Sequence, residues 1–93
     1  MDFEKLYIDG QWTSGASNRF IEVENPATRE IFARVPAGNE VDVDRAAKAA
    51  HRALPAWSAL SLAHRISLME KFLAIFQSQE DDLIDITIKE LGS

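Results

Sequence analysis

The sequence predicts an α+β fold in which three short antiparallel strands are followed by three helices. Up to Pro36, short runs of alternating apolar and polar residues are separated by turn-forming residues, which is typical of half-buried strands. From Asn39 onward, apolar residues recur every three or four positions, which is the spacing of amphipathic helices. We therefore expect strands over about residues 5–36 and helices over about residues 40–91.

The strand region contains two turn signals. Leu6 and Ile8 mark the first predicted strand, and the Asp9-Gly10 pair after it indicates a tight turn because glycine tolerates a positive φ. The second and third strands are expected to pair across residues 25–30, where an Asn-Pro pair interrupts the ladder. The face that should be covered carries Ile21, Val23, Ile31 and Val35.

The first helix should begin at Asn39, which is a good N-cap, with Asp42 as its capping-box partner. Pro55 should end or bend this helix. Trp57 follows and is expected to pack against both neighbouring helices. The predicted apolar stripe of the helix consists of Val43, Ala46, Ala47, Ala50 and Leu54.

The second helix should be capped by Ser61 and run to about Ser78. Its apolar residues cover more than half of its circumference, so it is expected to pack on more than one side; they are Leu62, Ile66, Leu68, Met69, Phe72, Leu73, Ile75 and Phe76. Ser78 and Asp81 suggest a capping box for the third helix, and Gly92 stands where its C′ residue belongs.

Composition limits the classes of function. The chain has 93 residues, a net charge of −5 and no cysteine, so we expect one domain without disulfides, a thiolate metal site or a cysteine nucleophile. The acidic balance argues against binding to nucleic acid or to an anionic membrane. Neither a secretory signal nor a membrane span is visible, and we expect a cytoplasmic location.

Candidate chemistry within the sequence is sparse. His51 and His64 have no second ligand at metal-binding spacing, so solvated or capping histidines are expected. The acidic run at residues 80–82 is typical of a helix N-terminus. No glycine-rich phosphate loop occurs, and Trp12 and Trp57 are expected to pack within a core or an interface.

Several local signals occur in an order that resembles the amino-terminal segment of the aldehyde dehydrogenase superfamily. They are Tyr7-Ile8-Asp9-Gly10-Gln11-Trp12, Asn25-Pro26-Ala27-Thr28, Val35-Pro36, Asp42-Val43-Asp44-Arg45-Ala46, Pro55-Ala56-Trp57, and the helix from Arg65 to Glu90-Leu91-Gly92. One departure is Arg29, which stands at a turn position where that family usually has glycine. The resemblance implies the outer part of an α/β NAD(P)-binding domain over residues 1–93.

The resemblance also implies an enzyme that uses NAD or NADP to oxidise an aldehyde to a carboxylic acid. The cysteine and glutamate of that reaction, and the residues that hold the cofactor, lie downstream of the matching segment. We therefore assign no catalytic or cofactor-binding residue and expect this chain alone to be inactive and to bind no cofactor. Some family members bind a monovalent cation at positions that match the main-chain carbonyls of Val23 and Glu24 and the carboxylate of Glu90.

Three hypotheses follow. The chain is the amino-terminal portion of an aldehyde dehydrogenase, or a stand-alone interaction or assembly module without catalysis, or an unrelated small acidic α+β domain. The broad apolar arc of the second helix favours the first two. The expected partners are the remainder of a parent enzyme or a second copy of the chain in a homo-oligomer.

Overall fold

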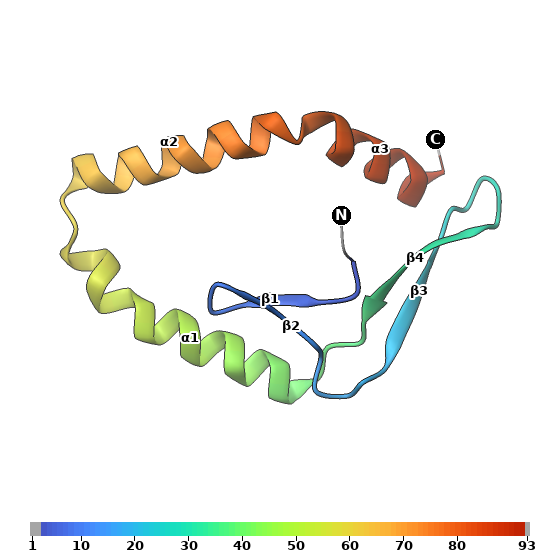
Figure 1. The fold of residues 1–93 in the computed structure, drawn as a ribbon, viewed down its shortest axis with the longest axis horizontal. Helices are drawn as coiled ribbons and strands as arrows, with labels where there is room; N and C mark the ends of the chain where they lie inside the picture. The colour runs from blue at the N-terminus through green and yellow to red at the C-terminus, as the bar shows by residue number, and fades with distance from the viewer. Residues whose placement is uncertain (1–2, 93) are drawn as a thin grey trace.

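The structure, a computed structural model, describes residues 3–92 and contains four strands followed by three helices (Figure 1). The strands are β1 (Leu6–Ile8), β2 (Gln11–Thr13), β3 (Phe20–Glu24) and β4 (Ile31–Pro36). The helices are α1 (Glu40–Ala59), α2 (Leu62–Ser78) and α3 (Glu80–Leu91). The predicted order of strands before helices is confirmed, and the predicted count of three strands is wrong by one.

The additional strand is β2, which pairs with β1 in an antiparallel hairpin of its own. Asp9 and Gly10 form the turn with φ values of 55° and 73°, as the Asp-Gly signal predicts. Tyr7 and Trp12 face each other across the hairpin with their ring centroids 5.1 Å apart. The sequence does not predict β2 because Gln11-Trp12-Thr13 has a single apolar residue and so shows no alternation, whereas Leu6 and Ile8 flank Tyr7 in β1.

The pairing of β3 with β4 is confirmed, with Ile21 opposite Val35 and Glu22 opposite Arg34. The ladder is irregular between Val23 and Glu24. The prediction that the apolar face of this hairpin is covered is met only in part, because Val23 and Val35 are half-buried whereas Ile21 is 55% and Ile31 49% exposed. The two hairpins form separate two-stranded sheets.

Helix α1 begins at the predicted capping box and continues past Pro55 to Ala59. Pro55 therefore does not end the helix. Proline removes one backbone hydrogen bond, to the carbonyl of His51, and the helix-compatible residues after it continue the turn. Trp57 consequently lies within α1 and is 39% exposed, so the expectation that it is packed against both helices is met only in part.

The side of α1 that packs on β1 differs from the predicted stripe. Ala49 is buried, whereas Val43 and Leu54 at the ends of the predicted stripe are exposed. The β1–β2 turn approaches a side of α1 that consists of alanines, and this seam is lined by Ala46, Ala49, Ala50 and Ala53. The predicted stripe and the observed seam share Ala46 and Ala50, so the periodicity located the apolar side of α1 approximately. It could not indicate where along that side the hairpin would lie.

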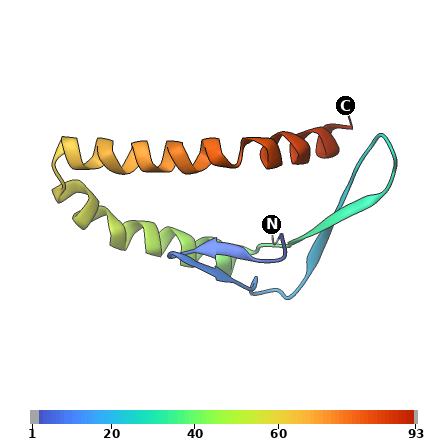
Figure 2. The same ribbon diagram turned by 45° about the horizontal axis from the view of Figure 1, so that its top comes forward.

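Helices α2 and α3 follow each other almost in line along one edge of the molecule (Figures 1 and 2). Ser61 caps α2 as predicted, its hydroxyl accepting from the N–H of His64 at 3.1 Å. The predicted Ser78–Asp81 capping box is wrong, because the Ser78 hydroxyl donates to the Ile75 carbonyl and Gln79 is the N-cap without a side-chain hydrogen bond. Gly92 ends α3 with a φ of 74°, which fits the predicted role of this glycine.

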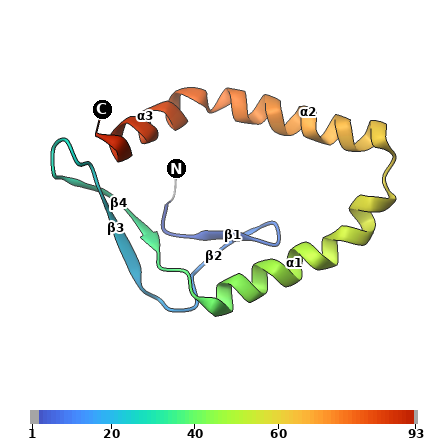
Figure 3. The same ribbon diagram turned by 180° about the vertical axis from the view of Figure 1, so that it is seen from behind.

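The elements form an open frame, seen from the opposite side in Figure 3. Its radius of gyration is 16.7 Å, against about 12 Å for a compact chain of this length. Its accessible surface is 7373 Å², against about 5,400 Å² for a compact monomer of this mass. Within residues 3–92 only Ala49 and Asp42 are buried. We predicted that the second helix packs on more than one side. Within the described residues it does not, since none of the residues of α2 is buried.

Candidate functional site

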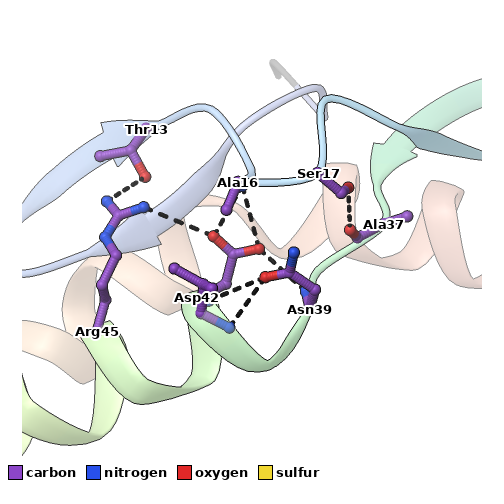
Figure 4. Close-up of polar contacts among 8 residues, drawn as sticks. Thr13, Ala16, Ser17, Ala37, Asn39, Asp42 and Arg45 are labelled. Carbon is purple, nitrogen blue, oxygen red and sulfur yellow. Dashed lines mark hydrogen bonds and ion pairs between the residues drawn. The ribbon is translucent and has the colours of Figure 1, made fainter.

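The most complete polar cluster surrounds Asp42 at the start of α1 (Figure 4). Its carboxylate, only 4% exposed, accepts from the N–H of Asn39 at 3.0 Å and from the N–H of Ala16 at 3.0 Å. The Asn39 side chain in turn accepts from the N–H groups of Val41 and Asp42. Three free N–H groups at the helix N-terminus are thereby satisfied, and the positive end of the helix dipole faces a carboxylate.

Two further contacts hold the loop between β2 and β3 against this helix start (Figure 4). Arg45 lies 3.6 Å from the Asp42 carboxylate and donates to the Thr13 hydroxyl at 3.4 Å. The Ser17 hydroxyl donates to the Ala37 carbonyl at 2.8 Å. The Asp42 carboxylate, the Asn39 side-chain oxygen and the Ser17 hydroxyl are all used within the chain, so the cluster fixes the junction of strands and helices.

An apolar groove of about 600 Å³ lies along the first turns of α2, beside the end of α1. It is lined by Trp57, Leu62, Arg65, Ile66, Met69, Glu70, Phe72 and Leu73. The Nε atom of Arg65 is buried there without a hydrogen-bond partner. We call the exposed apolar residues of this helix the α2 face: Leu62, Ile66, Met69, Phe72, Leu73, Ile75 and Phe76.

The structure brings the residues of the predicted cation site to one end of the frame. Val23 and Glu24 end β3 at the irregular point of the ladder, and α3, which carries Glu90, lies against β3. The Glu24 side chain pairs with Arg29, which leaves its main-chain carbonyl as the group that the site would use. The site stays a prediction.

Other sequence candidates show no assembled site. His51 and His64 are exposed, as expected for solvated histidines. Residues 3–92 contain no group of three or more histidine or carboxylate side chains that could hold a metal ion. In the same residues, no helix is both long enough and apolar enough to cross a membrane.

Comparison with known proteins decides the family. The family model described as aldehyde dehydrogenase family matches residues 12–93. The chain belongs to the aldehyde dehydrogenase family. A Staphylococcus aureus protein (strain bovine RF122 / ET3-1) named for this family is 38% identical over 92 residues, which covers 99% of this chain and 19% of that protein.

Solved structures agree with this membership. An aldehyde dehydrogenase from Bartonella henselae superposes with a TM-score of 0.92 and 29% identity, covering 100% of this chain and 20% of that one. A NAD-dependent benzaldehyde dehydrogenase from Corynebacterium glutamicum superposes with a TM-score of 0.87 and 29% identity, covering 97% of this chain and 20% of that enzyme. The chain thus spans about one fifth of the length of the relatives that it matches.

Sequence reasoning missed the long-range role of Asp42. It identified Asp42 as a local capping partner, and the N–H of Ala16 that it also binds is 26 residues away. No local pattern signals such a contact, because the loop carrying Ala16 reads only as flexible polar sequence.

Proposed function

We propose that this chain forms the amino-terminal outer part of the coenzyme domain of an NAD(P)-dependent aldehyde dehydrogenase, an enzyme that oxidises aldehydes to carboxylic acids. The observation that carries the proposal is a frame that superposes on an intact family member with a TM-score of 0.92 while only two of its described residues are buried. A chain that has the shape of an enzyme segment but almost no buried core of its own is expected to pack against the remainder of a longer polypeptide.

The residues of this chain would serve that enzyme by positioning and not by chemistry. The sequence contains no cysteine. The cofactor, when bound to the enzyme, supplies hydride acceptance at its nicotinamide. In this chain the Asp42 cluster would hold the strands at a fixed angle to α1, and the α2 face would pack against the remainder of the enzyme. The same proposal includes NAD or NADP as the cofactor of the enzyme, with no cofactor held by this chain itself. It also includes a cytoplasmic location.

Complementation tests the proposal. The Staphylococcus aureus relative would be expressed without the segment that this chain matches, alone or together with this chain, and NADH formation with a panel of aldehydes would be measured. We expect no activity from either piece alone and aldehyde-dependent NADH formation from the two together. The relative's own deleted segment, supplied in trans, is the matched control. Rescue by that segment and none by this chain would contradict the proposal.

A second candidate is a stand-alone interaction or assembly module without catalysis. The exposure of the α2 face favours it, because a contiguous apolar surface marks a contact site. Mixing the purified chain with the intact relative distinguishes the two. A module would associate with the undivided enzyme, whereas an enzyme portion would associate only when the matching segment has been removed.

A further inference from the structure

We propose that the turn of the first hairpin is a site of spontaneous covalent modification, at which Asp9 converts to isoaspartate, and that Arg52 slows this conversion. The proposal concerns the β1–β2 turn and does not depend on the enzyme role proposed above. It is carried by the Asp9-Gly10 pair, by the place of this pair in a short hairpin, and by the ion pair that joins the turn to α1.

The reaction takes place between two groups that are neighbours in the chain. The backbone nitrogen of Gly10 attacks Cγ of Asp9, so an N–Cγ bond forms and a Cγ–O bond breaks, and the amide hydrogen leaves with the carboxyl OH as water. Water then opens the resulting cyclic imide. Opening at Cγ restores aspartate, whereas opening at the main-chain carbonyl gives isoaspartate, in which the chain runs through Cβ and Cγ. One water is released and one is taken up, so the reaction needs no oxidant, reductant or cofactor.

The surroundings of Gly10 leave its nitrogen free to react. Glycine has no Cβ to hinder ring closure, and no described atom lies within 4 Å of the position that a Cβ would take. Asp9 and Gly10 are both exposed, and the Asp9 side chain is 70% exposed. Attack between adjacent residues also avoids the entropic cost of bringing two separate groups together. None of the other aspartates of the sequence precedes a glycine, so this pair is distinct from all of them.

The turn must open for the reaction to proceed, and the hairpin is short enough to open. Asp9 and Gly10 have φ values of 55° and 73°, which close a two-residue turn. Ring closure requires the Asp9 side chain to rotate onto the Gly10 nitrogen. Three residue pairs, from Leu6 opposite Thr13 to Ile8 opposite Gln11, hold the strands together. A two-stranded hairpin is marginally stable, so its tip opens locally at a small free-energy cost.

Arg52 restrains the side chain that reacts. Its Nη2 atom donates to Oδ2 of Asp9 at 3.5 Å and so ties the tip of the hairpin to α1. Rotation of the Asp9 carboxyl group onto the Gly10 nitrogen requires this ion pair to break. Because both side chains are largely exposed, the pair is weak, and its loss should accelerate the conversion by about two- to fivefold.

Isoaspartate would loosen the hairpin in which it forms. It adds one carbon to the backbone of the turn, and a two-residue turn fixes the register that sets Ile8 opposite Gln11. The rings of Tyr7 and Trp12, now 5.1 Å apart, would lose their fixed contact. We expect the near-ultraviolet circular dichroism of this aromatic pair to decrease as the isoaspartate accumulates.

Peptide mapping of the full chain after prolonged incubation at mildly acidic pH tests the site. Trypsin cuts after Lys5 and Arg19 and releases residues 6–19, a peptide in which Asp9 is the sole aspartate. We expect an isoaspartyl form of this peptide, labelled by an isoaspartate-specific methyltransferase and placed at position 9 by electron-transfer fragmentation. A synthetic peptide of residues 6–19 is the unfolded reference. Absence of isoaspartate from the folded chain after the free peptide has converted would overturn the proposal.

Three variants separate the site from its restraint. Asp9→Glu keeps the charge but would have to close a larger and slower-forming ring, so we expect no conversion. Arg52→Ala should convert about two- to fivefold faster than the wild type. Lys48→Ala is the matched control, because Lys48 lies one turn earlier on α1 and pairs with Asp44 instead of with the hairpin; it should convert at the wild-type rate. Equal rates for Arg52→Ala and the wild type, or equal acceleration by the two alanine variants, would overturn the role of Arg52.

Discussion

The Asp42 carboxylate accepts a hydrogen bond from the backbone N–H of Ala16, and this contact joins the loop after the first hairpin to the start of α1. Because the same carboxylate accepts from the N–H of Asn39, one side chain fixes both the helix start and the angle at which the strands meet it. In a frame with so little buried apolar surface, this polar junction restrains the strand half against the helix half, together with the contacts of α1 with β1 and of α3 with β3.

Asp42→Asn should lower the free energy of unfolding by about 1–3 kcal/mol, since the amide can present only one acceptor oxygen to the two buried N–H groups. Urea unfolding followed by circular dichroism measures this change. Asp44→Asn is the matched control on the same helix, because its exposed pair with Lys48 contributes at most about 1 kcal/mol. Equal effects of the two substitutions would contradict the junction role of Asp42.

Gly92 should not tolerate a side chain. Its φ is 74°, which costs an alanine about 1–2 kcal/mol, and an added Cβ would lie 2.7 Å from the Pro26 ring. Gly92→Ala should therefore destabilise the chain and release the end of α3 from the β3–β4 turn, which hydrogen exchange of the α3 amides would detect. Gly10→Ala is the control, because Gly10 has a φ of 73° and open space around it. Gly92→Ala should cost more than Gly10→Ala.

Arg29 carries backbone strain that a glycine would relieve. Its φ is 66°, a conformation that non-glycine residues adopt at a cost. Arg29→Gly should raise the unfolding free energy by up to about 1 kcal/mol, less the small contribution of the exposed ion pair with Glu24. Arg29→Ala loses the same ion pair and keeps the strain, so it should be less stable than Arg29→Gly. Thermal unfolding of the two variants side by side decides the sign.

Trp57 should contribute more to stability than Trp12, because Trp57 lines the apolar groove, whereas Trp12 is 60% exposed and lies against Tyr7 across a hairpin. With 39% of the residue exposed, Trp57→Ala should cost about 1–2 kcal/mol, and Trp12→Ala about 0.5–1 kcal/mol. Urea midpoints at one protein concentration compare them. Iodide quenching of Trp12→Phe, which leaves Trp57 as the sole indole, should show partial protection; quenching as strong as that of free tryptophan would refute its packing.

Local signals in the sequence predicted most of the elements but not how they would be covered. The capping box at Asn39 and Asp42, the Ser61 cap and the Gly92 stop are each decided within four residues, and each is confirmed. The Ser78 cap failed because that hydroxyl donates back to the Ile75 carbonyl, an alternative that the sequence pattern does not distinguish.

The sequence by itself determined the order of strands and helices, the hairpin turns and the family, since these rest on short-range backbone preferences and on residue order. Tertiary structure alone decided that Ala49 and not Val43 or Leu54 meets the first hairpin, and that Asp42 reaches Ala16 across 26 residues. It also decided that Ile21 and the α2 face stay open. Burial depends on which segments meet in space, and a periodic pattern records only that a face is apolar, not what will cover it.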